Sequence, residues 1–355
     1  MKRFLSSCAR LPRVVCMVGV AALLGSLAVT ACAQGVPVYD WVTVGDPGNP
    51  NDTINTGTTP NYGAVADSFQ IMKYEFTNQQ YTDFLNSVDS SGTNPNSIYN
   101  TSMGGQPRGG ISFASDAASG SKYAVKPDFG DKPVNYVSWF DAARVCNWLM
   151  NGATGTSSTE TGAYTLSGTS TAPAVNSGAT FYIPTENQWY KAAYYKGGGT
   201  NAGYWTYATQ SDTAPTAVTA GLTGIGSSGS TGNFANYNVV ADWNGRTGNV
   251  TTIATNGGAS AYGAFDMSGN VYEWVDIDGA DTSVRGLRGG SWFYPAPNLS
   301  SSIRDTLAPS FDSGRSSNGF RLVSPVGVPE PSTCAMALAG LACGGSVVFR
   351  RRKRA

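Results

Sequence analysis

The stretch Gly263–Trp274, GAFDMSGNVYEW, combines a turn signal with a strand signal. Gly269-Asn270 favours a tight turn, because both residue types tolerate backbone angles that other residues avoid. The β-branched and aromatic residues that follow predict a short strand over 271–275. Two carboxylates, Asp266 and Glu273, lie on either side of the turn. We therefore expect a turn that leads into a strand and is bracketed by acidic side chains.

Outward from this segment, the other strand signals are also short. They fall at residues 69–74, 164–166, 181–183, 288–292 and 319–323. Long segments rich in Gly, Ser and Thr separate them, notably 152–180 and 197–233. Loops of that length are uncommon unless they are functional or solvated. We expect one compact α+β domain that is rich in irregular loops, not two domains.

Three helix starts carry a capping box, in which a Ser or Thr is followed three residues later by an acidic or amide side chain. These are Thr77-x-x-Gln80, Ser138-x-x-Asp141 and Thr185-x-x-Gln188. After the second box, Ala142, Val145, Cys146 and Leu149 recur at helical spacing and predict a buried face. Cys146 is therefore expected to be a small buried hydrophobe, with a redox role as the alternative.

The composition excludes several classes of active site and partner. The 355 residues include no histidine, which excludes Ser-His-Asp and Cys-His nucleophile pairs and His-ligated zinc or iron. Of the six cysteines, only Cys146 lies between the terminal segments, so the folded part has no internal disulfide. That part, residues 34–328, carries 14 basic and 22 acidic residues, a net charge of −8. Binding to nucleic acid through phosphate contacts is therefore not expected.

Residues 1–33 are predicted to be a secretory signal peptide. A basic start precedes an apolar run from Val14 to Ala33, which ends in the small residues Ala31-Cys32-Ala33. Two alternatives remain. Val29–Cys32 also resembles a lipobox, in which Cys32 would carry an acyl anchor, and the apolar run could be a retained transmembrane helix.

Residues 328–355 begin with Val-Pro-Glu-Pro, continue with an apolar stretch from Cys334 to Phe349, and end in a basic cluster. The stretch is slightly short for a span of about 20 residues, and the basic cluster stops translocation at the cytoplasmic face. This order resembles the PEP-CTERM sorting signal. The resemblance implies export through the inner membrane, cleavage by a sorting protease of the exosortase type, and release or attachment at the cell surface or its exopolysaccharide. Membrane contact would then be transient; an ordinary C-terminal membrane anchor is the alternative.

Six short motifs follow one another along the chain. They are Ile71–Asn78 (IMKYEFTN), Pro133–Trp139 (PVNYVSW), Ile183–Trp189 (IPTENQW), Gly263–Trp274, Arg288–Trp292 (RGGSW) and Asn318–Arg321 (NGFR). Together they resemble the formylglycine-generating enzyme (sulfatase-modifying factor) family, over about residues 40–325. The resemblance implies a single domain, residues 34–327, with a variant of the C-type-lectin-like fold.

Active members of that family oxidise a cysteine of a sulfatase to formylglycine, and two thiols after the Gly-Gly-Ser motif hold their copper(I). The matching positions of this chain are Tyr294 and Leu299. Neither side chain ligates copper(I), so no copper is expected and an enzyme is not favoured. We expect an exported, non-catalytic binding or extracellular-matrix protein. A formylglycine-generating-type oxidase acting on a protein cysteine is the alternative.

In place of the family's active site, the chain offers a candidate ligand groove for a glycan or a peptide. Its residues are Ser291, Trp292, Phe293, Tyr294, Asn298 and Arg304. Aromatic faces stack on sugars or peptide side chains, and the polar groups supply hydrogen bonds. The alternative is that Trp292 and Phe293 belong to the core and the other residues to solvated surface. Arg288 and Arg321 are expected in internal ion pairs.

Calcium is the expected metal, because it prefers about six to eight oxygen ligands that mix carboxylates with backbone carbonyls. The family resemblance implies a first site made by the side chains of Asp266 and Glu273 and the carbonyls of Gly269 and Val271. It implies a second site made by the side chains of Asn236 and Asn244 and the carbonyls of Tyr237 and Arg246. The alternative is that Asp266 caps a turn and Glu273 makes an ion pair.

Overall fold

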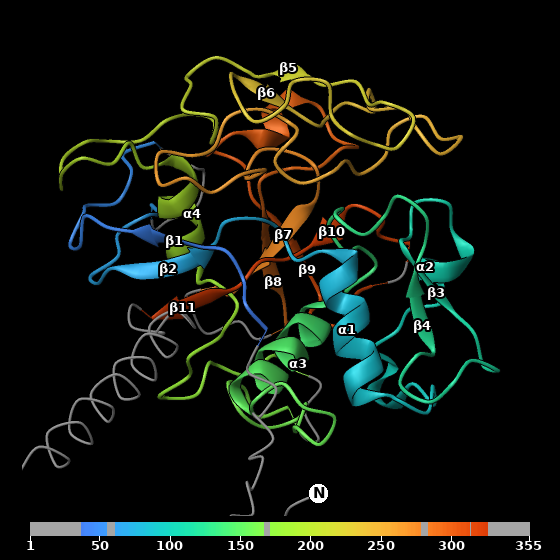
Figure 1. Cartoon of the computed structure of the whole chain (residues 1–355). Coiled ribbons are helices and arrows are strands. Elements are labelled where there is room, and N and C mark those ends of the chain that lie inside the picture. The colour runs from blue at the N-terminus through green and yellow to red at the C-terminus, as the bar shows by residue number, and fades with distance from the viewer. Residues whose placement is uncertain (1–36, 55–60, 167–170, 278–282, 313, 326–355) are drawn as a thin grey trace, which may run out of the picture. The chain divides into compact units, whose positions relative to one another are not determined.

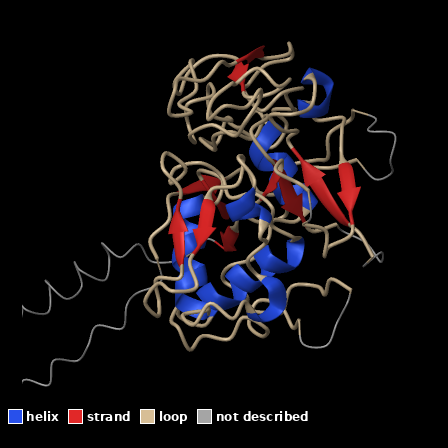
Figure 2. Ribbon diagram, turned by 90° about the vertical axis from the view of Figure 1, so that its right-hand side faces the viewer, coloured by secondary structure: helices blue, strands red, loops and turns tan. Residues whose placement is uncertain are grey.

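The structure, a computed structural model, describes residues 37–54, 61–166, 171–277, 283–312 and 314–325 (Figure 1). Both predicted terminal signals, 1–33 and 328–355, lie outside these residues. Within the described ranges, no helix combines the length and the apolar character needed to cross a membrane. Most of the described residues belong to loops and turns, not to helices or strands (Figure 2), as the sequence predicts.

Two small sheets hold the strands that position the candidate sites. The first has the order β1 (Trp41–Val44), β2 (Phe69–Met72), β11 (Val323–Pro325) and is antiparallel. The second has the order β10 (Asn318–Gly319), β7 (Tyr272–Val275), β8 (Arg285–Arg288), β9 (Asp305–Leu307). In the second sheet β10 runs parallel to β7, and Glu273 of β7 lies opposite both Gly319 and Arg288. The segment from β10 to β11 therefore joins the two sheets.

Two further strand pairs lie outside these sheets. They are β3 (Ile111–Phe113) with β4 (Tyr123–Val125), and β5 (Thr216–Ala217) with β6 (Phe234–Ala235). Helix α1 (Asn78–Val88) packs against β4, and a short helix, α2 (Ser102–Gly105), packs against β3.

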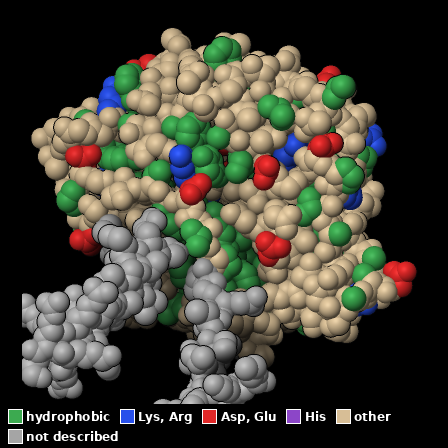
Figure 3. Space-filling view, in the orientation of Figure 1, with side chains coloured by type: hydrophobic (Ala, Val, Ile, Leu, Met, Phe, Trp, Pro, Cys, Tyr) green, Lys and Arg blue, Asp and Glu red, His purple; other side chains and the backbone are tan. Residues whose placement is uncertain are grey.

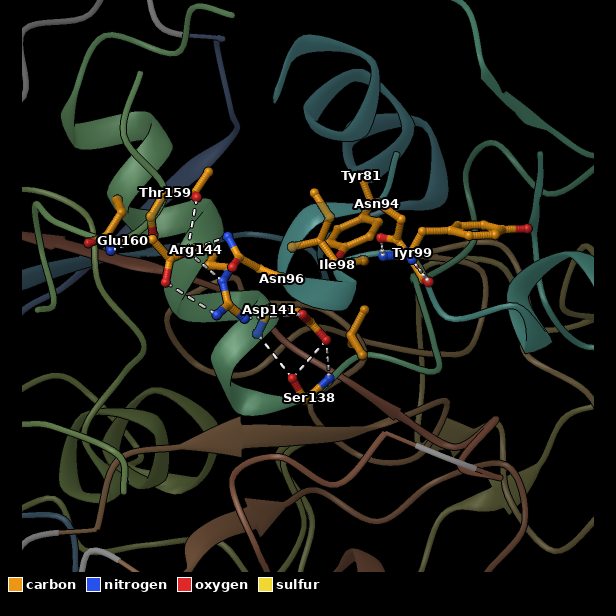
Figure 4. Close-up of polar contacts among 12 residues, drawn as sticks. Tyr81, Asn94, Asn96, Ile98, Tyr99, Ser138, Asp141, Arg144, Thr159 and Glu160 are labelled. Carbon is orange, nitrogen blue, oxygen red and sulfur yellow. Dashed lines mark hydrogen bonds and ion pairs between the residues drawn. The ribbon is translucent and has the colours of Figure 1, made fainter. Parts of the chain in front are cut away.

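Each predicted capping box begins a helix. The helices are α1 (Asn78–Val88), α3 (Trp139–Met150) and α4 (Glu186–Tyr194), and both reciprocal hydrogen bonds of every box are present. Figure 4 shows the box of α3, where the backbone nitrogen of Ser138 donates to Oδ2 of Asp141 at 2.8 Å. One turn further along, Arg144 pairs with Glu160 at 2.8 Å. These local signals were sufficient to predict the helix starts.

The core is aromatic. Trp139, Trp189 and Trp274 are fully buried, and the predicted inner face of α3 has no exposed area. Cys146 lies on that face, inside the largest apolar cluster. It is therefore packed as the hydrophobe that the helical spacing predicts.

Several predicted strands are wrong or displaced. At 164–166 the backbone nitrogen of Tyr164 donates to the side chain of Asn147 at 2.7 Å, so a side chain replaces a strand partner. At 181–183 the chain makes an isolated bridge between Tyr182 and Val323. The strand predicted at 288–292 ends at Arg288, because Gly289 and Gly290 adopt φ of 90° and 73°. The strand predicted at 319–323 is divided between β10 and β11.

Candidate functional site

Three carboxylates and one guanidinium are buried together where β7 begins. Nε and Nη2 of Arg321 donate to the two carboxylate oxygens of Glu273 at 2.6 and 2.8 Å, and Trp189 Nε1 donates to Glu273 Oε2 at 2.8 Å. Burial, with the charges of Asp266 and Glu273, raises the pKa of Glu75 well above its usual range. Burial also raises the pKa of Asp266. The cluster thus offers three acidic groups for one basic group.

Glu75 hydrogen-bonds the Gly-Asn turn, whereas Asp266 bonds the separate segment 254–256. The side chain of Asn270 donates to Glu75 Oε2 at 2.7 Å, and the backbone nitrogen of Val271 donates to Oε1 at 3.2 Å. Asp266, at φ 59°, accepts from the nitrogen of Ala254 at 2.6 Å and from Nδ2 of Asn256 at 2.9 Å. Only glycine fits at 269, because φ is 87° and a Cβ would collide with the carbonyl of Asn236. Glu75 lies 195 residues before Asn270, so no local sequence pattern marks it as part of this cluster.

The first predicted calcium site coincides with this cluster. The structure brings Asp266 and Glu273 into mutual electrostatic range, each with different hydrogen-bonding partners. Carboxylate oxygens are the ligands that a hard cation prefers. Both oxygens of Glu273, however, accept from Arg321 or Trp189, which is the ion pair that the alternative reading expects. Both oxygens of Asp266 likewise accept from Ala254 or Asn256. No group of three or more acidic, His or Cys side chains within the described ranges could hold a metal ion. A calcium ion would therefore depend on the carbonyls of Gly269 and Val271 as well.

Among the described residues, the four members of the second predicted calcium site share no hydrogen-bonding partner. Asn236 is fully buried, and its Oδ1 has no hydrogen-bond partner, which suits a cation ligand. The hydroxyl of Tyr237 donates to Pro215 O at 2.6 Å. Asn244 lies on an exposed turn and donates to Pro107 O at 2.9 Å. The carbonyl of Arg246 accepts from the nitrogen of Trp243 at 3.2 Å, so Asn236 fits the set better than Asn244 or Arg246 does.

The predicted groove residues fall into three environments. Ser291 and Trp292 are buried, and Trp292 packs in an apolar cluster with the Arg108 guanidinium 4.5 Å from its ring. Tyr294 and Asn298 both contact Tyr272: the two tyrosine rings are 5.2 Å apart, and Asn298 Nδ2 donates to the Tyr272 hydroxyl at 3.1 Å. Phe293 beside them is 54% exposed. Phe293, Tyr294 and Asn298 form the accessible part of the predicted groove.

Arg304 lies in a separate cluster. Its Nη1 donates to Glu186 Oε2 at 3.0 Å and to the hydroxyl of Tyr62 at 2.7 Å. Glu186, at the start of α4, also accepts from Nε of Arg288 at 2.7 Å. The internal ion pairs predicted for Arg288 and Arg321 are confirmed, and Arg304 shares the partner of Arg288.

The two positions that match the family's copper thiols are occupied as the sequence indicates. Leu299 is fully buried in an apolar cluster with Tyr207 and Ala235. The hydroxyl of Tyr294 accepts from Arg315 Nη1 at 3.3 Å. Cys146, the free cysteine of the described chain, is buried on α3, and burial raises the pKa of its thiol well above the usual range. None of these three side chains offers an accessible thiolate.

A pocket of about 630 Å³ was not predicted from the sequence. Its walls are segments 209–211 and 230–233 with Thr213, Gly258, Ala259 and Phe265. The only sequence signal was the length of the Gly/Ser/Thr-rich segment 197–233. Figure 3 shows that, on the face drawn, charged side chains are few and do not gather into a large patch of one sign.

Comparisons with known proteins identify a sorting motif and similar folds. Residues 327–353 match the PEP-CTERM protein-sorting motif, which indicates an exported, cell-surface-sorted protein that an exosortase processes. The fold is similar to that of CarF (24% identity, 82% of this chain and 99% of that chain covered, TM-score 0.48). It is also similar to Treponema denticola variable protein 1 (20%, 80% and 94%, 0.47) and to PvdO from Pseudomonas aeruginosa (17%, 82% and 99%, 0.45).

A search of curated proteins found no significant match. Residues 34–326 match the sulfatase-modifying factor enzyme 1-like domain, and the low content of regular structure agrees with that fold. The chain therefore belongs to the family of sulfatase-modifying factor enzyme 1-like domains.

Proposed function

We propose that this protein is an exported, non-catalytic binding protein built on the sulfatase-modifying factor scaffold. The observation that carries the proposal is the pair Tyr294 and Leu299 at the copper-thiol positions. Copper(I) requires soft sulfur ligands, and the phenol and the buried isobutyl group supply none. Cys146 cannot replace them, because it is buried on the apolar face of α3.

The ligand surface that we propose for this function is the accessible part of the predicted groove: Phe293, Tyr294 and Asn298. The exposed Phe293 ring, edge-on to Tyr294 at 5.3 Å, offers an apolar face beside a hydroxyl and an amide. Such a surface suits a glycan or a peptide at the cell exterior. Ser291 and Trp292 would support it from within, because their polar groups already contact the protein. Arg304 is not part of this surface, because it bonds Tyr62 and Glu186 in a separate cluster.

We also propose that calcium is held by the side chains of Asp266 and Glu273 with the carbonyls of Gly269 and Val271. The excess of buried acidic groups beside Arg321 supports this proposal. When bound, the ion would neutralise that charge and fix the turn that leads into β7; it would have no catalytic part.

The proposal is tested with the purified secreted protein, loaded anaerobically with copper(I) and then assayed, with dioxygen and a thiol reductant added, for conversion of a Cys-x-Pro-x-Arg peptide to formylglycine. We expect no stoichiometric copper and no product by mass spectrometry. The double variant Tyr294→Cys/Leu299→Cys is the matched control, since it restores both thiols and should gain copper. Turnover by the unmodified protein would overturn the proposal.

A further inference from the structure

We propose that the pocket between segments 209–213 and 230–233, Gly258, Ala259 and Phe265 binds a neutral oligosaccharide. It shares no lining residue with the surface around Tyr294, so this site is independent of the function proposed above. Its volume of about 630 Å³ lies within the range of ligand pockets, roughly 300–1,000 Å³.

The lining favours an uncharged, hydroxyl-rich ligand. None of the described residues that line the pocket is charged, and most are Ser, Thr, Asn or Gln. Asp212 lies within the first segment, but its carboxylate accepts from the backbone nitrogen and hydroxyl of Thr206 at 3.0 and 3.1 Å. The lining itself offers no counter-charge to a charged ligand, which would lose hydration here. The nearby Lys73, whose Nζ lies 5.7 Å from the centroid of the Phe265 ring, is not a lining residue. Hydroxyls and amides both donate and accept, which matches the hydroxyls of a sugar.

Asn233 holds the hydroxyls of one wall in place. Its Oδ1 accepts from Thr209 Oγ1 at 2.6 Å, and its Nδ2 donates to Ser211 Oγ at 3.0 Å. The same Nδ2 donates to the carbonyl of Thr213 at 3.1 Å. Hydroxyls fixed in this way need not be ordered when a ligand binds, which removes one cost of binding.

The opposite wall offers donors that the protein does not use. Ser230 and Thr231 are exposed, and their hydroxyls make no hydrogen bond within the described ranges. Bonds across the pocket hold the walls together: Gln210 Nε2 donates to Ala259 O at 3.0 Å, and Gly258 N donates to Gly232 O at 2.8 Å. The walls of the pocket are therefore joined by hydrogen bonds, and the hydroxyls of Ser230 and Thr231 are available to a ligand.

Phe265 supplies the aromatic surface that sugar rings require. Its ring stacks on Tyr74, with centroids 5.8 Å apart and planes inclined by 28°. Its backbone is held on both sides, because its nitrogen donates to Lys73 O at 2.8 Å and its carbonyl accepts from Arg321 Nη2 at 2.7 Å. A rigid ring beside fixed hydroxyls allows a sugar to place its C–H face on the ring and its hydroxyls on the wall.

The test is isothermal titration calorimetry of the full secreted protein with cellohexaose, laminarihexaose, xylohexaose, mannohexaose, maltohexaose and chitohexaose. Oligogalacturonate and a mixed neutral peptide library are the competing ligand classes. We expect at least one neutral hexasaccharide to bind, and the acidic sugar and peptides not to. In Thr231→Trp, which fills the pocket from an exposed position, we expect affinity to fall by about tenfold or more.

The matched control is Thr219→Trp, an exposed threonine that does not line the pocket, which should bind as the unmodified protein does. Melting curves check that both variants are folded. Failure of every neutral hexasaccharide to bind, preferred binding of the acidic sugar or of peptides, or equal affinity in Thr231→Trp would each overturn the proposal. Copper-dependent turnover would contradict the proposed function but would leave this result standing.

Discussion

Arg321 and Glu273 form a bidentate ion pair in the interior, with N–O distances of 2.6 and 2.8 Å and almost no exposed area on either side chain. Glu273 belongs to β7, and Arg321 lies between β10 and β11. The remaining donors of Arg321 bond the carbonyls of Met72, at the end of β2, and of Phe265. The guanidinium of Arg321 therefore hydrogen-bonds a strand of each sheet and the backbone of Phe265, which lines the pocket.

Arg321→Met is expected to lower the free energy of unfolding by about 3–5 kcal/mol, because it leaves the Glu273 carboxylate buried without its counter-charge. Chemical denaturation monitored by tryptophan fluorescence measures the change. The control is Arg315→Met, which removes a half-buried guanidinium that bonds Tyr294 and should cost less than about 1 kcal/mol. Equal losses in the two variants would mean that the buried pair of Arg321 contributes no more to the free energy of unfolding than the contact of Arg315 does.

The sequence predicted best the elements that short-range contacts determine. The caps at Thr77, Ser138 and Thr185 bond residues three positions away, so their pattern is visible in a few letters. The strands at 164–166 and 181–183 failed because the backbone found partners such as the Asn147 side chain, which no local pattern specifies. The strand predicted at 288–292 failed for another reason: the positive φ angles of Gly289 and Gly290 end the strand at Arg288.

The site residues show the same limit. Motifs identified Asp266, Glu273 and Arg321, but not that Glu75 lies beside them, since its partner Asn270 is 195 residues away. Arg304 follows the Gly-Gly-Ser motif closely, yet it bonds Tyr62 and Glu186. The pocket could not be predicted at all, because three separated loops and Phe265 form it.

The pH dependence of stability should reveal the buried Asp141. Burial raises the pKa of this carboxyl from 3.8 to about 7, against the hydrogen bonds from Ser138. The folded state therefore holds the proton more tightly than the unfolded state, and this group lowers stability progressively as pH rises from about 4 to about 7. Asp141→Asn keeps an acceptor for Ser138 and lacks this penalty.

We expect the melting temperature of Asp141→Asn, relative to the unmodified protein, to rise from about pH 4 to about pH 7 and then to level off. Thermal melts in buffers of matched ionic strength measure it. Asp83→Asn, which removes an exposed carboxylate on α1, is the control for the loss of one negative charge. A difference for Asp141→Asn that does not change with pH would contradict the raised pKa.

Cys146→Ser is expected to cost about 1–3 kcal/mol of stability and to leave ligand binding unchanged, because it places a hydroxyl without a designed partner in the core. Cys146→Ala removes the thiol without adding a polar group and should cost less. Denaturation and calorimetric binding are measured on both variants. Loss of binding at unchanged stability would show that the thiol is used chemically.

Removal of residues 329–355, within the segment that matches the sorting motif, is expected to abolish sorting to the cell surface. The truncated protein should be secreted with the melting temperature of the processed form, since the domain match ends at residue 326. Cell fractionation and immunofluorescence report its location. Normal surface localisation of the truncated protein would contradict the sorting role.

Calcium removal is the last test, and it concerns the excess of acidic groups around Arg321. An ion that binds only the folded state stabilises it by about 2.7 kcal/mol at 100 times its dissociation constant, which corresponds to a melting shift of roughly 4 °C for a domain of this size. The unmodified protein should therefore melt lower after chelation and recover with calcium. Magnesium should restore it poorly, because its small octahedral shell suits a carbonyl-rich turn badly.

Asp266→Ala should melt low and respond weakly to added calcium, since one of the two carboxylate ligands is gone. Glu273→Ala also breaks the Arg321 pair, so its low melting temperature is informative only through its response to calcium. Asp83→Ala, on the exposed face of α1, should respond as the unmodified protein does. If the unmodified protein is indifferent to chelator and elemental analysis finds no calcium, the buried carboxylates must instead be balanced by Arg321 and by the protons that the raised pKa values of Glu75 and Asp266 retain.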